Sequence, residues 1–445
     1  MGFDSSVDGR DVWRGTLIGF AFVMHILYNQ GMFLPTTAEE VHALGWDGLD
    51  IILVTGDSYI DSPFIGAALL GKLLLRAGFR VGILAQPDVK DTVDMQRLGE
   101  PRLFWGVTAG SVDSMVANYT ASGRKRKQDD YTPGGENSRR PDRASIVYAN
   151  LIRRCFKNTR PIVLGGIEAS LRRVAHYDYW SNALRRSLLL DAKADYLLYG
   201  MADLSVVELA QRLHQGQEVE TLRGLCYLSR KVPEGYIPLP SYEAVVADKS
   251  VFTEMFHVFY QNNDPLTAKG LAQKHGDRWL VQNPPYPYPN QAELDGIYNL
   301  EFERAQHPYY ERMGTVKALE TIRFSISTHR GCYGECNFCA IAVHEGRTVR
   351  WRSADSVVAE ARQISQRPDF KGYLLDVGGP TANMYGFECE KKLRRGACVN
   401  RRCLFPEVCA QLHPDHRPQL ALLSALRKIP GVKKVFVASG VRYDL

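Results

Sequence analysis

Short apolar runs, each the length of one buried strand, alternate with helical stretches between residues 45 and 230. Strands of a parallel sheet are buried on both faces, so they read as continuous apolar runs, and each needs a long crossover to reach the next. Five runs have this character: 50–55, 79–84, 103–108, 161–164 and 195–199. They predict an α/β fold in which residues 45–230 form a flavodoxin-like, doubly wound N-terminal domain.

The helical stretches and the strand ends extend this prediction. One helix is expected over 61–75, with Asp61 and Ser62 as candidate N-caps, and another over 144–156. Ligands of doubly wound sheets bind outside the carboxyl ends of the strands. Glycines and two carboxylates stand at or just after those ends, namely Gly56, Asp57, Gly110, Gly165, Gly166 and Glu168. We therefore expect this edge of the sheet to bind a ligand.

The rest of the chain divides into further parts. Residues 1–44 are an extension and lead-in, because the apolar run 16–28 is too short to span a bilayer and no cleavage site follows it. Residues 231–315, rich in proline and tyrosine, are expected to form a largely irregular connector to a second domain at 316–445. Within the first domain, residues 122–143 are expected to be a solvated surface loop, with a lid or a nucleic-acid contact as the alternative.

Cysteine and charge are distributed unevenly. Residues 321–445 hold seven of the nine cysteines and carry 20 basic and 11 acidic side chains, a net charge of +9, whereas residues 1–320 carry 35 and 38, a net charge of −3. Nine cysteines in 445 residues are too sparse for a disulfide-stapled secreted scaffold. The distribution favours a metallocentre in a cytoplasmic protein with no membrane segment, and a C-terminal part that can attract an anionic ligand.

Three of these cysteines, Cys332, Cys336 and Cys339, follow a predicted strand at 322–328 with the spacing C-x₃-C-x₂-C. Three thiolates on one loop can ligate three irons of a [4Fe–4S] cube and leave the fourth iron open. A structural zinc site needs a fourth ligand, for which His344 is the nearby candidate, and a redox thiol pair needs only two cysteines. The spacing favours iron–sulfur over both alternatives.

The motif C-x₃-C-x-aromatic-C at a strand end, with Phe338 in the aromatic position, resembles the signature of the radical S-adenosylmethionine (SAM) superfamily. The resemblance narrows to the YgiQ-type radical SAM family through stretches spread over residues 32–445: Thr55–Asp57, Tyr131–Gly134, Arg140–Ala144, Gly165–Arg173, His176–Trp180 and Leu280–Pro284. It implies that SAM binds the open iron, that Phe338 packs against its adenine, and that an electron donor drives its cleavage to a 5′-deoxyadenosyl radical. It brings no substrate with it.

The resemblance also implies a partial (β/α) barrel over 316–445. Ser353 is the expected N-cap of a helix, and strands are predicted at 373–377 and 434–438. Gly378 and Gly379 stand where the superfamily has a Gly-Gly-Glu segment that contacts SAM. Pro380 replaces the glutamate, so only the two glycines are carried over. Three strands leave an open edge, and we expect a truncated radical SAM core.

Four more cysteines, Cys389, Cys398, Cys403 and Cys409, are interleaved with basic residues. They could close a zinc site, hold a second iron–sulfur cluster, or be structural thiols. The surrounding cations suit an anionic substrate such as RNA, or form a solvated basic loop.

The N-terminal domain resembles cobalamin-binding domains that precede some radical SAM modules. Residues 43–175 contain no histidine, so the usual Asp-x-His-x-x-Gly ligand motif is missing and the sequence argues against bound cobalamin. The leading hypothesis is therefore an enzyme with a [4Fe–4S] cluster and SAM as cofactors. The rival hypotheses are a zinc-stabilised RNA-binding protein and an inactive truncated remnant.

Overall fold

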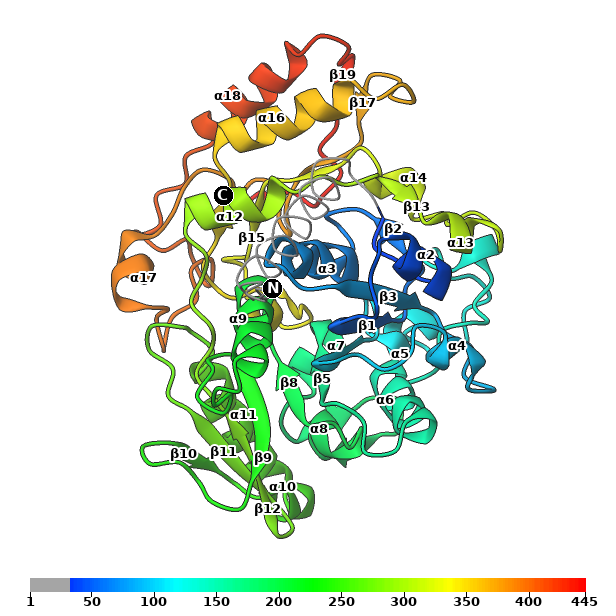
Figure 1. The fold of residues 1–445 in the computed structure, drawn as a ribbon. Helices are drawn as coiled ribbons and strands as arrows, with labels where there is room; N and C mark the ends of the chain where they lie inside the picture. Colours follow the sequence, from blue (N-terminus) through cyan, green and yellow to red (C-terminus); the bar gives the residue numbers. More distant parts are fainter. Residues whose placement is uncertain (1–32) are drawn as a thin grey trace, which may run out of the picture.

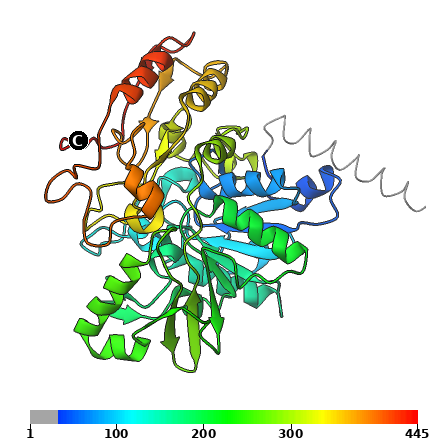
Figure 2. The same cartoon turned by 90° about the vertical axis from the view of Figure 1, so that its left-hand side faces the viewer.

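A computed structural model describes residues 33–445 of the chain, so the apolar run 16–28 lies outside the described residues. One large sheet with helices on both faces forms the body, and a smaller part built from residues after 319 stands beside it (Figures 1 and 2). The first described helix is α2 (Ala38–Ala43), where Thr37 and Glu40 form a capping box.

Five parallel strands make the first half of the sheet. They are β1 (Ile51–Thr55), β3 (Val81–Ala85), β4 (Phe104–Thr108), β5 (Ile162–Gly165) and β8 (Tyr196–Leu198). Their spatial order is β3-β1-β4-β5-β8, which is the 2-1-3-4-5 order of a flavodoxin-like sheet. All five predicted strands are therefore present within two residues of their expected bounds.

The sheet continues where an irregular connector was predicted, and that prediction is wrong. The added strands are β9 (Leu225–Ser229), β10 (Ile237–Leu239), β11 (Leu271–His275) and β12 (Arg278–Gln282). They complete a nine-stranded sheet, in which the pairs β8–β9, β9–β12 and β12–β11 are antiparallel and the edge pair β11–β10 is parallel. The abundance of proline and tyrosine obscured short strands whose side chains, such as Leu271 and Val281, are buried. The same segment contains α10 (Tyr242–Ala247), α11 (Lys249–Gln261) and α12 (Gln291–Tyr298).

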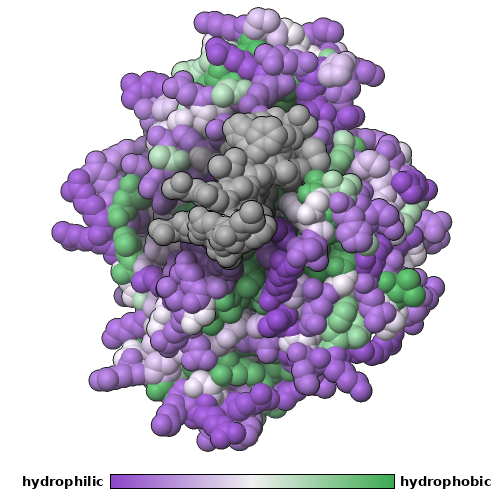
Figure 3. Space-filling view, in the orientation of Figure 1, coloured by the Kyte–Doolittle hydropathy of each residue, from purple (hydrophilic) through white to green (hydrophobic). Residues whose placement is uncertain are grey.

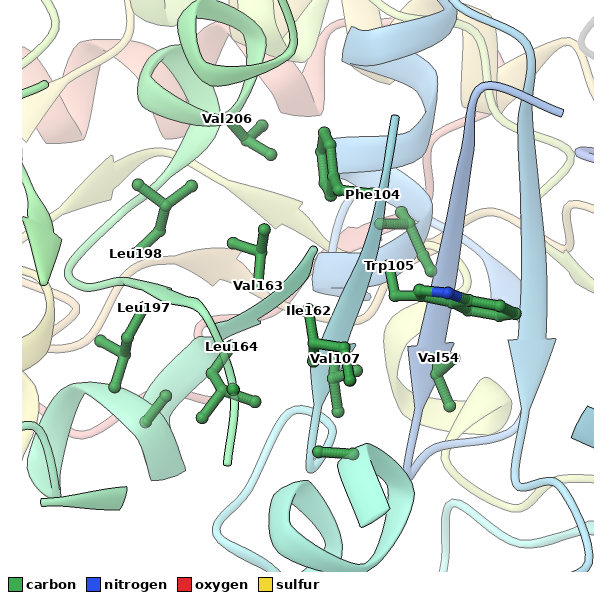
Figure 4. Close-up of a cluster of buried hydrophobic side chains, with 14 of the residues drawn as sticks. Val54, Phe104, Trp105, Val107, Ile162, Val163, Leu164, Leu197, Leu198 and Val206 are labelled. Atoms are coloured by element: carbon green, nitrogen blue, oxygen red, sulfur yellow. The ribbon is translucent and has the colours of Figure 1, made fainter. Parts of the chain in front are cut away.

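Helices α3 (Gly66–Arg76) and α9 (Asp203–His214) pack against each other on one face of the sheet, and α6 (Ala144–Cys155) packs on the other. The shorter elements are α4 (Val93–Gln96), α5 (Ser114–Asn118), the 3₁₀ turn Pro133–Gly135, α7 (Gly166–Leu171), α8 (Leu188–Asp191), β6 (His176–Asp178), β7 (Ala183–Arg185), β13 (Ala305–Gln306) and α13 (Pro308–Glu311). Figure 4 shows how side chains of the central strands alternate: Phe104 and Val163 point towards α9, and Leu164 and Val107 point away from it.

The predicted helix 61–75 begins five residues later than expected. Residues Ile60–Asp61 form strand β2, which pairs with β13, and the buried Asp61 carboxylate bonds Lys72 at 3.2 Å and the Glu303 N–H at 2.8 Å. Asp61 therefore stabilises the chain crossing at this point and does not cap the helix.

The smaller part contains two short parallel strand pairs, one short antiparallel pair (β15 with β16) and five helices, of which α16 and α18 are the longest. Its elements are α14 (Leu319–Ile322), β14 (Ile326–Ser327), β15 (His329–Arg330), α15 (Ile341–His344), β16 (Arg350–Trp351), α16 (Ala354–Ser365), β17 (Tyr373–Leu374), β18 (Val377–Gly378), α17 (Glu390–Arg395), α18 (Arg417–Arg427) and β19 (Lys434–Val435). Strand β14 pairs with β18, and β17 pairs with β19. The predicted strand 322–328 starts only at Ile326, because its first residue ends helix α14. Ser353 caps α16 as predicted.

Hydrophilic residues dominate the face drawn in Figure 3, with apolar residues in small separate areas. Among residues 33–445 no helix is long and apolar enough to cross a membrane.

A buried ion pair joins the two parts. Arg330 at the end of β15 donates to both carboxylate oxygens of Asp203 on α9, at 2.5 and 3.2 Å, and to the Tyr298 hydroxyl at 3.0 Å. Burial alone would lower the pKa of Arg330, but Asp203 outweighs it and holds the pKa above its usual value.

Replacing Asp203 with alanine should lower the free energy of unfolding by about 3–5 kcal/mol, because it leaves the Arg330 charge buried without a partner. Urea unfolding followed by tryptophan fluorescence measures the loss. Glu390→Ala is the control, since it removes an exposed ion pair with Arg394 and should cost about 0.3–0.5 kcal/mol. Equal losses in the two variants would contradict a structural role for the buried pair.

Candidate functional site

The three cysteines of the C-x₃-C-x₂-C motif lie on a loop that turns sharply after β15. Gly331 has φ +79°, and a side chain there would collide with the Thr348 carbonyl. The Gly331 N–H donates to the Glu345 carboxylate at 2.9 Å, at the C-terminal end of α15. The hydrogen bond therefore joins the first residue of the cysteine loop to the residue that follows α15, the helix at the end of the same loop.

The thiols converge inside this loop. A Cβ on Gly334 would lie 3.2 Å from Cys332 Sγ and 3.5 Å from Cys336 Sγ, and the Gly334 N–H donates to Cys332 Sγ at 3.3 Å. Burial raises the pKa of Cys332, and the nearby thiols of Cys339 and Cys336 raise it further. All three side chains remain partly accessible. The structure thus brings the three predicted ligands together on one partly accessible loop.

The donor set fits an iron–sulfur cube better than a zinc ion. Among the described residues no three His, Cys, Asp or Glu side chains are placed to hold one metal ion. His344, the candidate fourth zinc ligand, directs Nδ1 to Ser170 Oγ on α7 at 3.0 Å. Three converging thiols with no fourth ligand match a [4Fe–4S] cluster that keeps one iron open.

The Gly-Gly segment lies directly beside this loop. Gly378 pairs with Ser327 in the next strand, and a Cβ on Gly379 would lie 2.6 Å from His329 Nε2. Only glycine allows this approach of the two backbones. Two residues further on, Thr381 Oγ1 lies 3.3 Å from Cys332 Sγ, and its carbonyl lies 3.0 Å from His329 Nε2. The two predicted glycines and the cysteines therefore share one site.

Phe338 differs from the other site residues in its exposure. Its side chain is 93% exposed, although it stands between Asn337 and Cys339 in the same loop. A ring that packs against no neighbouring core can stack on a ligand, so the predicted contact with adenine stays a prediction.

Arg442 is a site residue that the sequence did not reveal. Its Nη1 donates to Cys336 Sγ at 3.4 Å, and its backbone exchanges two hydrogen bonds with the Asn383 side chain, at 2.8 and 2.9 Å. No local pattern marks it, because it lies 106 residues from the cysteine it contacts. Hydrogen bonds to cluster sulfurs are one way in which proteins set the cluster potential.

The second cysteine group is only partly assembled. Cys389 and Cys403 are buried in an apolar cluster with Tyr333, Cys409 packs at its edge, and Cys398 lies outside it. The Cys409 N–H donates to the Cys403 carbonyl at 2.8 Å. Burial raises the pKa of Cys403, and Lys392 opposes this shift. This packing suits structural thiols, and metal binding at this group stays a prediction.

A cavity of about 290 Å³ opens at the carboxyl edge of the sheet. Its walls are the sheet face and helices α3 and α9, with Phe104, Val163, Leu198 and Val206 around it (Figure 4). Protein interiors contain few voids larger than a water molecule, so a cavity of this size at this edge marks a candidate ligand site.

Polar groups gather at the rim of this cavity. Thr55, Thr108 and Ser111 come from the sheet and its loops. His344 and Glu345 come from the smaller part of the molecule, at the end of α15. Burial lowers the pKa of His344 to about 4, so its imidazole is neutral at physiological pH. The cavity therefore lies between the two parts of the molecule.

Two strand-end carboxylates bond the protein itself. Asp57 accepts from Arg140 Nη1 at 2.8 Å, and the same guanidinium bonds Asp129 at 3.1 Å. Glu168 accepts the N–H groups of Ser114 and Ser145, at 2.9 and 3.2 Å. All of these charged groups are buried, and their bonds hold the strand-end loops in place. Asp57 also lines the cavity together with Gly110, Gly165 and Gly166, whereas Glu168 does not. Since Asp129 and Arg140 are buried, residues 122–143 are also not wholly a solvated loop.

The chain matches the family model "Radical SAM N-terminal" over residues 33–325. It is 56% identical to a UPF0313 protein of Fusobacterium nucleatum over 414 residues, covering 93% of this chain and 73% of that protein. It is 52% identical to a UPF0313 protein of Thermotoga petrophila over 416 residues, with the same coverage.

Two solved structures are similar to this one. The radical SAM methyltransferase TsrM from Kitasatospora setae, with cobalamin and a [4Fe–4S] cluster bound, aligns at TM-score 0.40 and 17% identity, covering 74% of this chain and 47% of its own. The cobalamin-dependent SAM radical enzyme OxsB, with aqua-cobalamin and SAM bound, aligns at TM-score 0.44 and 10% identity, covering 93% and 48%. Both of these structures hold cobalamin, and the sequence-based prediction against this cofactor conflicts with them and is withdrawn.

The two cysteine groups can be separated by substitution. Cys336→Ala should remove most of the iron and the brown colour from anaerobic preparations, whereas Cys403→Ser should keep that iron and lose only metal bound at the second group. Iron, zinc and acid-labile sulfide are measured per chain, with Cys226→Ala, a buried thiol of β9, as the control. Full iron in Cys336→Ala would exclude this loop as the ligand set. Unchanged total metal in Cys403→Ser would identify the second group as structural thiols.

Proposed function

The chain belongs to the UPF0313, YgiQ-type family, and from that premise we propose that it is a radical SAM enzyme that binds a [4Fe–4S] cluster through Cys332, Cys336 and Cys339. The observation that supports this most directly is the convergence of the three thiols beside Gly378–Gly379. We further propose that the enzyme is cytoplasmic and that an electron donor is its partner. The proposal does not name the substrate of the enzyme.

Cys332, Cys336 and Cys339 would hold the cluster, which in its reduced form would supply the single electron needed to cleave the C5′–S bond of SAM into methionine and a 5′-deoxyadenosyl radical. The residues around the cluster site would position SAM for this cleavage. Gly378 and Gly379 let a ligand approach the backbone without meeting a Cβ. Phe338 offers an exposed ring to the adenine, and the Arg442 guanidinium, which is paired with Asp444, donates a hydrogen bond to Cys336.

Anaerobic protein reduced with dithionite and given SAM should release 5′-deoxyadenosine without any added substrate, because the three cysteines leave one iron open for the cofactor. Chromatography of the incubation measures the product, and Cys339→Ala provides the background. No excess over that background, in protein with full iron and sulfide, would overturn the proposal. Zinc without sulfide would favour the rival zinc-stabilised RNA-binding protein.

We also propose that the cavity beneath α15 receives part of a cobalamin molecule, the ligand named for TsrM and OxsB. The support comes from the cavity of this chain: apolar walls, a polar rim, and the neutral His344 with Nδ1 held by Ser170. A molecule as large as cobalamin would enter only in part, with its bulk at the open edge of the sheet.

Protein incubated with hydroxocobalamin and passed through a desalting column should retain the cofactor, measured by its visible absorbance. Val206→Phe should abolish retention without lowering the melting temperature, because the new ring fills empty space. Val245→Phe is the control: it overpacks a core position away from the cavity, and should lower the melting temperature yet keep retention. No retention by the unmodified protein, or retention by Val206→Phe, would overturn this proposal.

A further inference from the structure

Two neighbouring hairpins form a surface that the radical SAM chemistry does not use. Strands β6 and β7 make the first hairpin, over 176–185. The second spans 118–127: Tyr119 and Lys125 form an antiparallel bridge, and the Thr120 N–H donates to the Arg124 carbonyl at 2.8 Å. The Tyr179 hydroxyl donates to the Ala121 carbonyl at 2.7 Å and so joins the two. We refer to these segments together as the double hairpin.

Aromatic rings cover one part of the double hairpin. The ring of Trp180 lies 5.4 Å from that of Tyr119 and 5.2 Å from that of Tyr179, measured between centroids. Tyr177 and Tyr179 are 49% and 59% exposed. Large exposed rings that lie together usually mark a contact surface, because water solvates them poorly.

Positive charge lies next to these rings. Arg124, Lys125, Arg126 and Lys127 are all exposed, and within residues 33–445 none of the four forms an ion pair with a carboxylate. Lys125 stands opposite Tyr119 in the bridge, so the cations and the rings form one continuous surface.

Three of the carboxylates around the double hairpin are already bonded to other groups, and a fourth, Glu136, is exposed opposite Gln128. Asp142 accepts from the Tyr119 hydroxyl and the Asn118 amide, each at 2.7 Å, and Asp178 is buried and paired with Arg143 at 2.5 Å. Asp130 lies 3.5 Å from Lys317. The four cations therefore remain available to an external anion.

We propose that the double hairpin binds single-stranded nucleic acid, with bases stacked on Tyr177 and Tyr179 and phosphates held by residues 124–127. Cations alone would suit any polyanion, but exposed rings interleaved with cations match the way in which single strands are bound without sequence readout. This surface lies outside the cysteine site, so the inference does not rest on the proposed function. For residues 122–143 the sequence left open a solvated loop, a lid or a nucleic-acid contact, and this proposal adopts the nucleic-acid contact.

The test measures fluorescence anisotropy of a labelled twelve-nucleotide RNA of mixed sequence, and of the matching DNA, between 50 and 200 mM KCl. Four phosphate contacts predict a slope of about −3 in log K against log salt, because each single-strand contact contributes about −0.7. Arg124→Ala with Lys125→Ala should halve that slope. Tyr179→Ala should weaken binding by about 5- to 150-fold through loss of base stacking, and Tyr179→Phe should retain most of it.

Matched controls lie elsewhere on the surface. Phe256→Ala removes an exposed ring of α11, and Lys433→Ala with Lys434→Ala removes two exposed cations at β19; neither should change binding. Cys336→Ala should bind normally, which separates this proposal from the iron–sulfur site. No binding at 50 mM KCl, or equal effects of the control variants, would overturn it. Equal affinity for polyglutamate, unaffected by Tyr179→Ala, would show a polyanion contact instead. The ratio of the affinities for the RNA and the matching DNA shows which of the two nucleic acids this surface prefers.

Discussion

The ion pair between Arg330 and Asp203 is the contact on which the relation of the two parts depends. A buried guanidinium is tolerated only with a partner and satisfied donors, and here Asp203 and Tyr298 supply both. Arg330 stands two residues before Cys332. The pair therefore fixes the start of the cysteine loop against the first turn of α9, the helix that also walls the cavity.

Other buried charges repeat this arrangement along the boundary. Glu360 on α16 bonds Arg352 at 2.5 Å and also bonds Arg304, which lies in the segment between the two parts. Glu335, inside the cysteine loop, accepts from the Tyr260 hydroxyl of α11 at 2.9 Å. Such pairs contribute less to net stability than apolar packing of the same volume, but they penalise every arrangement that separates them. The boundary is thus specified by charge pairing, which suits a site that needs residues from both sides.

The sequence predicted the parts whose signals are local. Buried parallel strands are continuous apolar runs, so all five were identified, and the cysteine spacing on one loop needs no distant partner. What failed depended on long-range contacts. The strands after residue 224 join a sheet whose other strands lie much earlier in the chain. Asp61 has the neighbours of a helix N-cap, but its carboxylate bonds Lys72 and the Glu303 N–H instead. Arg442 reaches Cys336 only through the fold, and the Asp57, Arg140 and Glu168 bonds show that family motifs can be structural.

Helix α15 connects the two candidate ligand sites. It follows Cys339 after one residue, and the residues at its C-terminal end have opposite roles: Glu345 accepts the Gly331 N–H of the cysteine loop, and His344 bonds Ser170 of the sheet domain. Both side chains also line the cavity. Burial raises the pKa of Glu345, and its hydrogen bond from Gly331 opposes this shift. The cavity and the cysteine loop therefore share the same four-residue helix. Coupling between the two sites needs no path longer than α15, because each site already contacts it.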